Sequence, residues 1–375
     1  MNSKDKFLST LEFKKNNVIP NLEIGLWPQT IIRWEKEGFP KGILDEESIV
    51  FFYHGNKYLG LLDFVQVLNI DVWQPYPKLE EVIIEENDDY KLFIDNVGRK
   101  RKALKKGSFL GMRLSMDQYI DFPVKNRKTF IKYKKYFENP YYERYPANYD
   151  EIKSNFKNID KPLMLLNNDE SFGYYSMLRR WVGTENLSYM FFDDPSLVHE
   201  CCEFITEYFI NLVLKAVNEI IFDFIIIHED LAYKTGPLIS PNLFMKFFQS
   251  HYKKVVNFLK SNGVKLVIVD TDGNFEVLIR LFLEAGIDGF LPMEVAAGMD
   301  PVKMRKKYGK SFCMIGGVDK RELSKDKISI KYEIEKLAPV IKGGGYIPCI
   351  DHIIPPDISL QNFLYYLELK NKTLQ

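Results

Sequence analysis

Five short apolar runs in the C-terminal half of the chain each end in polar, mostly acidic residues, and helix-like stretches separate them. They are Phe224–Asp230, Leu266–Asn274, Phe290–Glu294, Phe312–Asp319 and Gly343–His352. Continuous apolar strands that alternate with helices are typical of a parallel sheet covered on both faces. Charges confined to the strand ends favour a (β/α) barrel, which carries its functional residues at the carboxyl ends of its strands. The pattern therefore predicts an α/β fold with a single (β/α)8 TIM-type barrel, and an enzyme.

The N-terminal part of the chain follows a different pattern. It predicts an opening helix, a second helix around Gln29–Glu37, and β or hairpin structure at Ile49–Tyr58 and Val82–Lys106, with a turn near Asp95–Gly98. The barrel pattern begins with a strand at Pro162–Asn168. We therefore expect residues 1–160 to form helices and a β-hairpin packed on the barrel. Residues 161–375 would then form its main part, within one structural domain.

Composition excludes several classes of function. The 51 Lys and Arg residues balance 51 Asp and Glu residues, so nucleic acid is not an expected partner. We interpret the basic run Arg99–Lys106 as a solvated strand edge. Neither a dinucleotide nor a P-loop fingerprint occurs, so no nucleotide is expected. The four cysteines show no CxxC spacing, which suits a reducing cytoplasm. No run of about 18 apolar residues predicts a membrane span.

Ionisable residues gather where the predicted strands end. Because barrel strands direct their last residues to one mouth, we expect these residues to converge there: His228, Glu229, Asp230, Asp270, Asp272, Glu294, Asp319, Asp351 and His352. Strand alternation places Asp270 and Asp272 on the same side. Asp270, Asp272 and His352 are candidates for holding a hard divalent metal, or for proton transfer with an orienting partner. Glu229 and Asp270 are candidates for general acid or base, with His228 beside them.

Each of these acids also has a structural interpretation. Asp272-Gly273-Asn274 is a good N-cap sequence for the helix predicted after it, and other acids could pair with Lys or Arg. Burying so many acids without a function is expensive, so the cluster as a whole favours a site.

Further residues are candidates for binding a substrate. Lys234 could hold an anionic group, with Tyr233 beside it, although a solvated loop lysine is the simpler interpretation. Arg33 and Trp34 could add a cation and an aromatic wall, although an amphipathic surface helix explains them almost as well. The remaining candidates for substrate contacts are the strand-end acids Glu294, Asp319 and Asp351.

Motifs at the strand ends resemble the uroporphyrinogen decarboxylase superfamily, which includes the corrinoid-linked methyltransferases. The segments that carry the resemblance are residues 181–200, 228–241, 269–274, 291–300, 315–323 and 343–357. The resemblance covers most of the chain from Pro162 on and is weaker through residues 27–40 and 121–127. It implies the barrel fold and a site at its mouth, but does not select one reaction.

Two departures from the superfamily pattern bear on the reaction. Decarboxylases carry an arginine-rich N-terminal signature that grips a polycarboxylate tetrapyrrole, whereas the corresponding region here offers only Arg33. Zinc methyltransferases carry a His-x-Cys motif where this chain has Asp270-Thr271-Asp272. At their last ligand position it has His352, with Cys349 displaced. The resemblance thus implies a branch of the superfamily with a harder ligand set. Any metal bound there would be a harder ion than the zinc that thiolate ligands bind.

We therefore expect a methyltransferase that works with a corrinoid or a small methyl donor. A tetrapyrrole decarboxylase is the alternative, and a non-catalytic barrel that binds a small molecule is the third hypothesis. The candidate cofactors are a corrinoid (cobalamin) and one divalent metal. The candidate partners are a small-molecule substrate, a corrinoid protein and a second copy of the chain.

Overall fold

A curled parallel sheet forms the centre of the molecule. The computed structural model describes residues 1–14, 18–45, 48–106, 108–109, 112–113, 116–138, 141–167 and 172–374. Its largest sheet has the strand order β1-β8-β9-β12-β13-β14-β15, with neighbours parallel throughout. The strands are β1 (Gln66–Leu68), β8 (Leu163–Leu165), β9 (Phe224–His228), β12 (Leu266–Asp270), β13 (Gly289–Leu291), β14 (Cys313–Val318) and β15 (Tyr346–Ile350). The predicted α/β barrel class is confirmed, and each of the five apolar runs overlaps one of these strands.

Alternation along the strands divides their side chains between two cores. Ile226 and Ile268 point inward and fill the inside of the curled sheet, while Ile225 and Val267 point outward and pack under the covering helices. Successive side chains of a strand face opposite sides. Because both sides are apolar here, the strands are buried on both faces.

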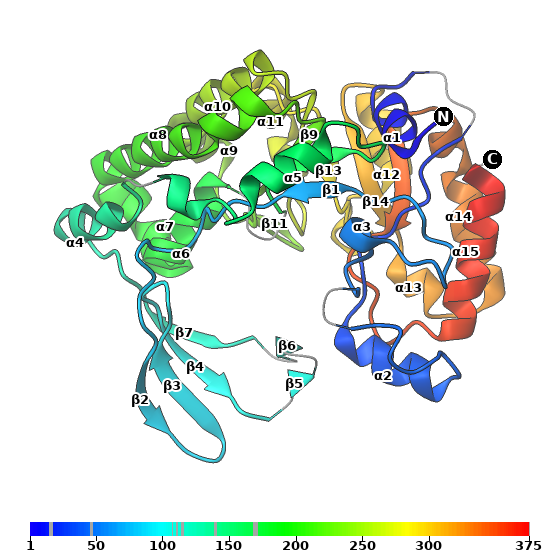
Figure 1. Cartoon of the computed structure of the whole chain (residues 1–375), viewed down its shortest axis with the longest axis horizontal. Coiled ribbons are helices and arrows are strands. Elements are labelled where there is room, and N and C mark those ends of the chain that lie inside the picture. Colours follow the sequence, from blue (N-terminus) through cyan, green and yellow to red (C-terminus); the bar gives the residue numbers. More distant parts are fainter. Residues whose placement is uncertain are drawn as a thin grey trace.

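Helices cover the outside of this sheet (Figure 1). The longest, α8 (Pro195–Glu219), begins where Asp194 accepts a hydrogen bond from the backbone N–H of Leu197, and Ser240 caps α9 (Pro241–Phe247) in the same way. In both helices a proline, Pro195 or Pro241, follows the capping residue at the first helical position, where its missing N–H has no cost. The other covering helices include α6 (Tyr174–Val182), α7 (Thr184–Asp193), α10 (Gln249–Ser261), α11 (Ile279–Glu284), α12 (Pro301–Tyr308), α13 (Lys320–Leu323), α14 (Lys327–Lys342) and α15 (Leu360–Leu374).

The N-terminal segment completes the barrel between β15 and β1. Leu26 forms a parallel bridge with Ile354, whose backbone N–H donates to the carbonyl of Gly25 at 2.8 Å. The carbonyl of Ile24 accepts a hydrogen bond from Phe52 in α3 (Phe51–His54). Helix α1 (Ser3–Leu11) inserts apolar side chains into the core inside the curled sheet. The eighth barrel position is thus occupied by extended chain and a helical turn.

The expectation of β structure at Ile49–Tyr58 was wrong. This stretch contains α3, a single helical turn that ends at Gly55 with φ at +63°. Phe51 packs in the core outside the sheet and Phe52 in the core inside it, so one helical turn contributes a side chain to each core. The second predicted helix, around Gln29–Glu37, is confirmed as α2 (Pro28–Lys36).

A buried ion pair locks the N-terminal segment in place. Glu23 is fully buried, and its carboxylate accepts hydrogen bonds from Lys370 Nζ at 2.5 Å and from the Tyr366 hydroxyl at 2.5 Å, both in α15. It also accepts one from the backbone N–H of Ile350 at the end of β15, at 2.9 Å. The N-terminal segment therefore meets two elements from the other end of the sequence, β15 and α15, at one carboxylate.

A second sheet projects away from the barrel (Figure 1). Its antiparallel strands, in the order β2-β3-β4-β7, are β2 (Val82–Glu86), β3 (Tyr90–Ile94), β4 (Lys100–Leu104) and β7 (Gln118–Asp121). The predicted turn is confirmed, since Gly98 N–H donates to the carbonyl of Asp95. The basic run was wrongly taken as a strand edge. It forms β4, an inner strand of this sheet, and its arginines pair with Asp95 and Asp117.

No helix within the described part of the chain combines the length and the apolar character needed to cross a bilayer.

We predict that Glu23→Gln lowers the free energy of unfolding by about 3–5 kcal/mol, because it leaves the Lys370 ammonium buried without a counter-charge. Urea denaturation followed by circular dichroism would measure the loss. The matched control is Lys372→Ala, which breaks the exposed Lys372–Glu368 pair of the same helix and should leave the unfolding midpoint unchanged. Equal, small effects of both substitutions would contradict the role given to Glu23.

Candidate active site

A cavity of about 380 Å³ opens at the carboxyl ends of the barrel strands. Its polar lining consists of His228, Asp230, Asp270, Thr271, Asp272 and His352. Its apolar lining includes Ile226 and Leu291 from the strands, and Ile24, Leu26, Ile49, Val50, Phe52 and Tyr53 from the N-terminal part. Within the described residues, no lysine or arginine lines it. A volume of this size, mostly apolar with a few convergent polar groups, is typical of a small-molecule site.

His228 and Asp270 form the first of two histidine–aspartate pairs in the cavity. They end the neighbouring strands β9 and β12 and lie opposite each other in register. His228 Nδ1 is 3.1 Å from Asp270 Oδ2. Burial by itself lowers the pKa of His228, but the hydrogen bond and the negative charge of Asp270 outweigh burial, so its pKa is raised. The pair therefore keeps a transferable proton to a higher pH than a free histidine would.

His352 and Asp272 form the second pair. His352 Nε2 is 3.5 Å from Asp272 Oδ2, and the imidazole stacks on the indole of Trp27 with ring centroids 6.3 Å apart. Burial lowers the pKa of His352, but Asp272 outweighs it and raises the pKa. Burial raises the pKa of Asp272, but His352 outweighs it and lowers that pKa. As predicted, Asp270 and Asp272 both face the cavity.

These pairs do not assemble the predicted metal set. Asp270 turns to His228 and Asp272 turns to His352, although all three predicted ligands line one cavity. Among the described residues, no three His, Cys, Asp or Glu side chains come together as a group that could hold a metal ion. The arrangement supports proton transfer and orientation, and we derive no metal-assisted step from it.

Glu229 points away from the cavity, although its neighbours in sequence face it. Its carboxylate is fully buried and accepts hydrogen bonds from the backbone N–H groups of Tyr175 and Ser176, both at 3.0 Å, and from the Tyr252 hydroxyl. Burial raises the pKa of Glu229 against these hydrogen bonds. The first turn of α6 can approach because Gly173 lies against the carbonyl of His228, where a Cβ would be only 2.1 Å away. Glu229 therefore caps α6, and this position does not support its predicted role in proton transfer.

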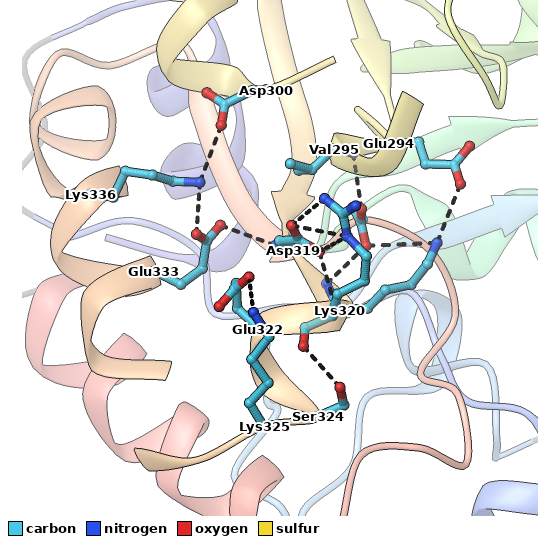
Figure 2. Close-up of polar contacts among 12 residues, drawn as sticks. Glu294, Val295, Asp300, Asp319, Lys320, Glu322, Ser324, Lys325, Glu333 and Lys336 are labelled. Carbon is cyan, nitrogen blue, oxygen red and sulfur yellow. Dashed lines mark hydrogen bonds and ion pairs between the residues drawn. The ribbon is translucent and has the colours of Figure 1, made fainter. Parts of the chain in front are cut away.

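The remaining strand-end acids tie loops together beside the cavity (Figure 2). Asp351 is buried and accepts hydrogen bonds from the backbone N–H groups of Val295 and Lys320. Burial raises the pKa of Asp351 to about 6, against the opposing charge of Lys320. The Lys320 ammonium lies 3.6 Å from Glu294 and 3.8 Å from Asp351. Glu294 also accepts a hydrogen bond from the N–H of Gly273. These contacts fit the structural interpretation of the acids.

Asp319 likewise serves a helix end. It caps α13 and binds the guanidinium of Arg321, and this hydrogen bonding outweighs burial and lowers the pKa of Asp319. Its own N–H donates to Glu333, which pairs with Lys336 at 2.7 Å (Figure 2). Asp319 does not line the cavity.

The four candidates from outside the strand ends also lie away from the cavity lining. Tyr233 and Lys234 are exposed on the hairpin of β10 (Ala232–Tyr233) and β11 (Gly236–Pro237). Trp34 is buried and donates from its indole to the carbonyl of Ile358. Arg33 donates to the carbonyls of Pro356 and Asp357. Arg33 and Trp34 thus fasten the chain after β15 to α2.

Two residues of the site were missed in the sequence. Trp27 stacks on His352, and Tyr53 lines the cavity with its hydroxyl 2.8 Å from the side-chain oxygen of Asn167. Neither lies in a strand-end motif. They reach the mouth only because the N-terminal segment closes the barrel, so no local signal could have identified them.

Comparisons with known proteins agree with this architecture. The uroporphyrinogen decarboxylase (URO-D) family model matches residues 174–372. The uroporphyrinogen decarboxylase of Campylobacter jejuni subsp. jejuni is 27% identical over 123 residues, which are 33% of this chain and 32% of that protein. That of Nautilia profundicola is 22% identical over 196 residues, 48% of this chain and 50% of that protein. The matches therefore span about a third to a half of these relatives. A methyltransferase from Methanosarcina mazei superposes with a TM-score of 0.61 at 14% identity, covering 99% of each chain, and shows the fold.

We predict that Trp27 fluorescence rises as His352 loses its proton, because a stacked imidazolium quenches indole more than neutral imidazole does. Asp272→Asn should move this transition to lower pH, since the raised pKa of His352 depends on the Asp272 carboxylate. A pH titration of fluorescence would measure both. The contribution of the pair to stability should be complete between the ordinary pKa values of aspartate and histidine. It should be lost as the pH rises through the raised pKa of His352 or falls through the lowered pKa of Asp272.

Asp270→Asn is the matched control for this titration, because it removes the same charge from the other pair. It should move the Trp27 transition to lower pH by much less than Asp272→Asn does, since Asp270 is a smaller cause of the raised pKa of His352. Trp27→Phe should abolish the signal. A transition that persists in His352→Gln would contradict the assignment.

Proposed function

The chain belongs to the uroporphyrinogen decarboxylase family, and from that premise we propose that it is a methyltransferase acting on a small molecule bound in the cavity at the barrel mouth. One observation carries the choice of reaction. The cavity is lined by Asp230, Asp270 and Asp272, with two histidines and no lysine or arginine among the described residues. A tetrapyrrole with many carboxylates needs free cationic partners. The described lining offers none, because each imidazole is paired with an aspartate and Asp230 is paired with Arg179, which lies outside the lining.

Size supports the same choice. A volume of about 380 Å³ suits a small organic donor. A macrocycle would have to lie across the mouth, outside this volume. Ile226 precedes His228 by two residues on the same side of β9, so it lies roughly 6.6 Å deeper along the strand. The apolar part of the donor would thus lie deeper in the cavity, against Ile226. The atom that bears the methyl group would lie level with the two histidine–aspartate pairs.

The His228–Asp270 pair is the proposed proton donor. When the bond between the methyl group and its heteroatom breaks, the heteroatom keeps the electron pair and takes the proton of the His228 imidazolium. Asp270 holds the imidazole in orientation and stabilises its charged form. The His352–Asp272 pair, packed on Trp27, would orient the donor.

The methyl group needs an acceptor, and a corrinoid would supply that nucleophile when bound. The cavity is too small to enclose a corrinoid, so it would meet the donor from the open mouth. Tyr233 and Lys234 are exposed on the β10–β11 hairpin and are candidates for contacting it or the protein that carries it.

We predict that purified protein transfers a methyl group from a small methylated donor to free reduced corrinoid. His228→Gln and Asp270→Asn should each slow the transfer by roughly 10²–10⁴-fold, the usual range for loss of a positioned acid. The change in the absorbance of the corrinoid on methylation measures the rate across a panel of methyl ethers, thioethers and amines.

The control is Glu322→Gln, which removes a carboxylate paired with Lys325 outside the cavity and should keep the rate of the unchanged protein. Carbon dioxide release from tetrapyrrole carboxylates, without methyl transfer, would overturn the proposal in favour of a decarboxylase. Saturable donor binding with neither reaction would favour the non-catalytic barrel.

A further inference from the structure

Asp230 differs from the other two aspartates of the cavity lining in its partner. Asp270 and Asp272 pair with histidines that also line the cavity. The counter-ion of Asp230 is Arg179 of α6, which lies outside the lining. Asp230 takes no part in the proton transfer proposed above. Its carboxylate is therefore available for another task in the cavity.

Contacts with α6 fix the position of Asp230. Arg179 donates one hydrogen bond to Asp230 Oδ2 and a second, at 3.2 Å, to the backbone carbonyl of Asp230. The backbone N–H of Asp230 donates to the Ser176 hydroxyl at 2.8 Å. The preceding residue, Glu229, accepts hydrogen bonds from the first turn of the same helix. The Asp230 carboxylate is thus held in one orientation before any ligand binds, which reduces the entropy that binding costs.

One oxygen of this carboxylate is unused. Among the described residues, Asp230 Oδ2 accepts the hydrogen bond of Arg179, and Asp230 Oδ1 has no partner. The side chain is 35% exposed, and the residue lines the cavity. The Oδ1 atom can therefore accept a hydrogen bond from a molecule bound there.

Strand alternation sets the spacing between this acceptor and the proposed proton donor. His228 and Asp230 both line the cavity, whereas Glu229 between them points away. Two residues of extended chain span roughly 6.6 Å. The negative charge of Asp230 reaches His228, because it contributes to the raised pKa of that histidine. A group bound by Asp230 would thus lie several bonds away from an atom that receives a proton from His228.

We propose that Asp230 is a specificity-determining residue that binds a hydroxyl group of the methyl donor, several bonds from the methylated heteroatom. This inference rests on the proposed function, because it takes the cavity as the site of the donor. A carboxylate oxygen only accepts hydrogen bonds, so the group that it binds must be a donor.

The balance of charges favours a hydroxyl over an ammonium group. Arg179 balances the charge of Asp230, and each protonated histidine balances the aspartate with which it pairs. The described lining then offers no net negative charge to a cation. Burying an ammonium group without a counter-charge is costly, whereas a neutral hydroxyl needs only the hydrogen bond.

The binding of three matched methyl ethers tests the proposal without requiring turnover. The first is a methoxyalkanol with a terminal hydroxyl, and the others carry a methyl or an ammonium group in its place. Isothermal titration calorimetry with the full chain, at a pH where both histidines are protonated, measures each dissociation constant. The methoxyalkanol should bind about 10- to 100-fold more tightly than either analogue, the range of a hydrogen bond to a charged group. Asp230→Ala should abolish this preference.

The methyl analogue is the internal control, because its affinity should be nearly unchanged in Asp230→Ala, which would show that the variant keeps its fold and cavity. Arg179→Gln is the matched variant, since it keeps the carboxylate and removes its counter-charge. It should increase the affinity of the ammonium compound by about 10-fold.

The outcomes separate this inference from the proposed function. Equal binding of the hydroxyl and methyl compounds, or an equal loss of both in Asp230→Ala, would overturn the inference and leave Asp230 as a support of α6. A hydroxyl preference that depends on Asp230, without methyl transfer, would support the inference and contradict the methyltransferase. Failure of all three compounds to bind would overturn both.

Discussion

The buried contact of Glu23 with Lys370 and Tyr366 is the interaction on which the rest of the site depends. It fixes the N-terminal segment beside β15, where a barrel strand would otherwise lie. The residues that follow it, Ile24 and Leu26, then form one wall of the cavity. A buried ion pair gains little over apolar packing in stability, but breaking it is costly, and its directional hydrogen bonds allow one register only. The walls of the cavity therefore depend on the N-terminal segment that closes the barrel as much as on the barrel strands.

The strand-end acids divide into two groups with different physical roles. Glu229, Glu294, Asp319 and Asp351 satisfy backbone N–H groups or lysine and arginine side chains, which holds the loops of the mouth in place. Asp270 and Asp272 instead pair with the imidazoles of His228 and His352. Only this second group presents protons to the cavity. The first group makes the geometry of the second rigid, because each buried carboxylate needs all of its hydrogen bonds.

The projecting sheet is organised by different rules from the barrel. Its strands are antiparallel and amphipathic, and Arg101 stacks across strands on the rings of Phe93 and Tyr119 on one side. The barrel strands are apolar on both faces and need helices on the outside. The small sheet therefore needs no covering layer of helices, whereas the barrel sheet does.

The sequence by itself determined the parallel sheet, the helix caps at Asp194 and Ser240, and the gathering of His228, Asp270, Asp272 and His352 at one mouth. These follow from strand alternation and from capping, which act between residues close in sequence. Only the tertiary structure decided which histidine each aspartate meets, that Glu229 turns outward to cap α6, and that Trp27 and Tyr53 reach the mouth. Those outcomes depend on strand register and barrel closure, which join residues distant in sequence and leave no local pattern to detect.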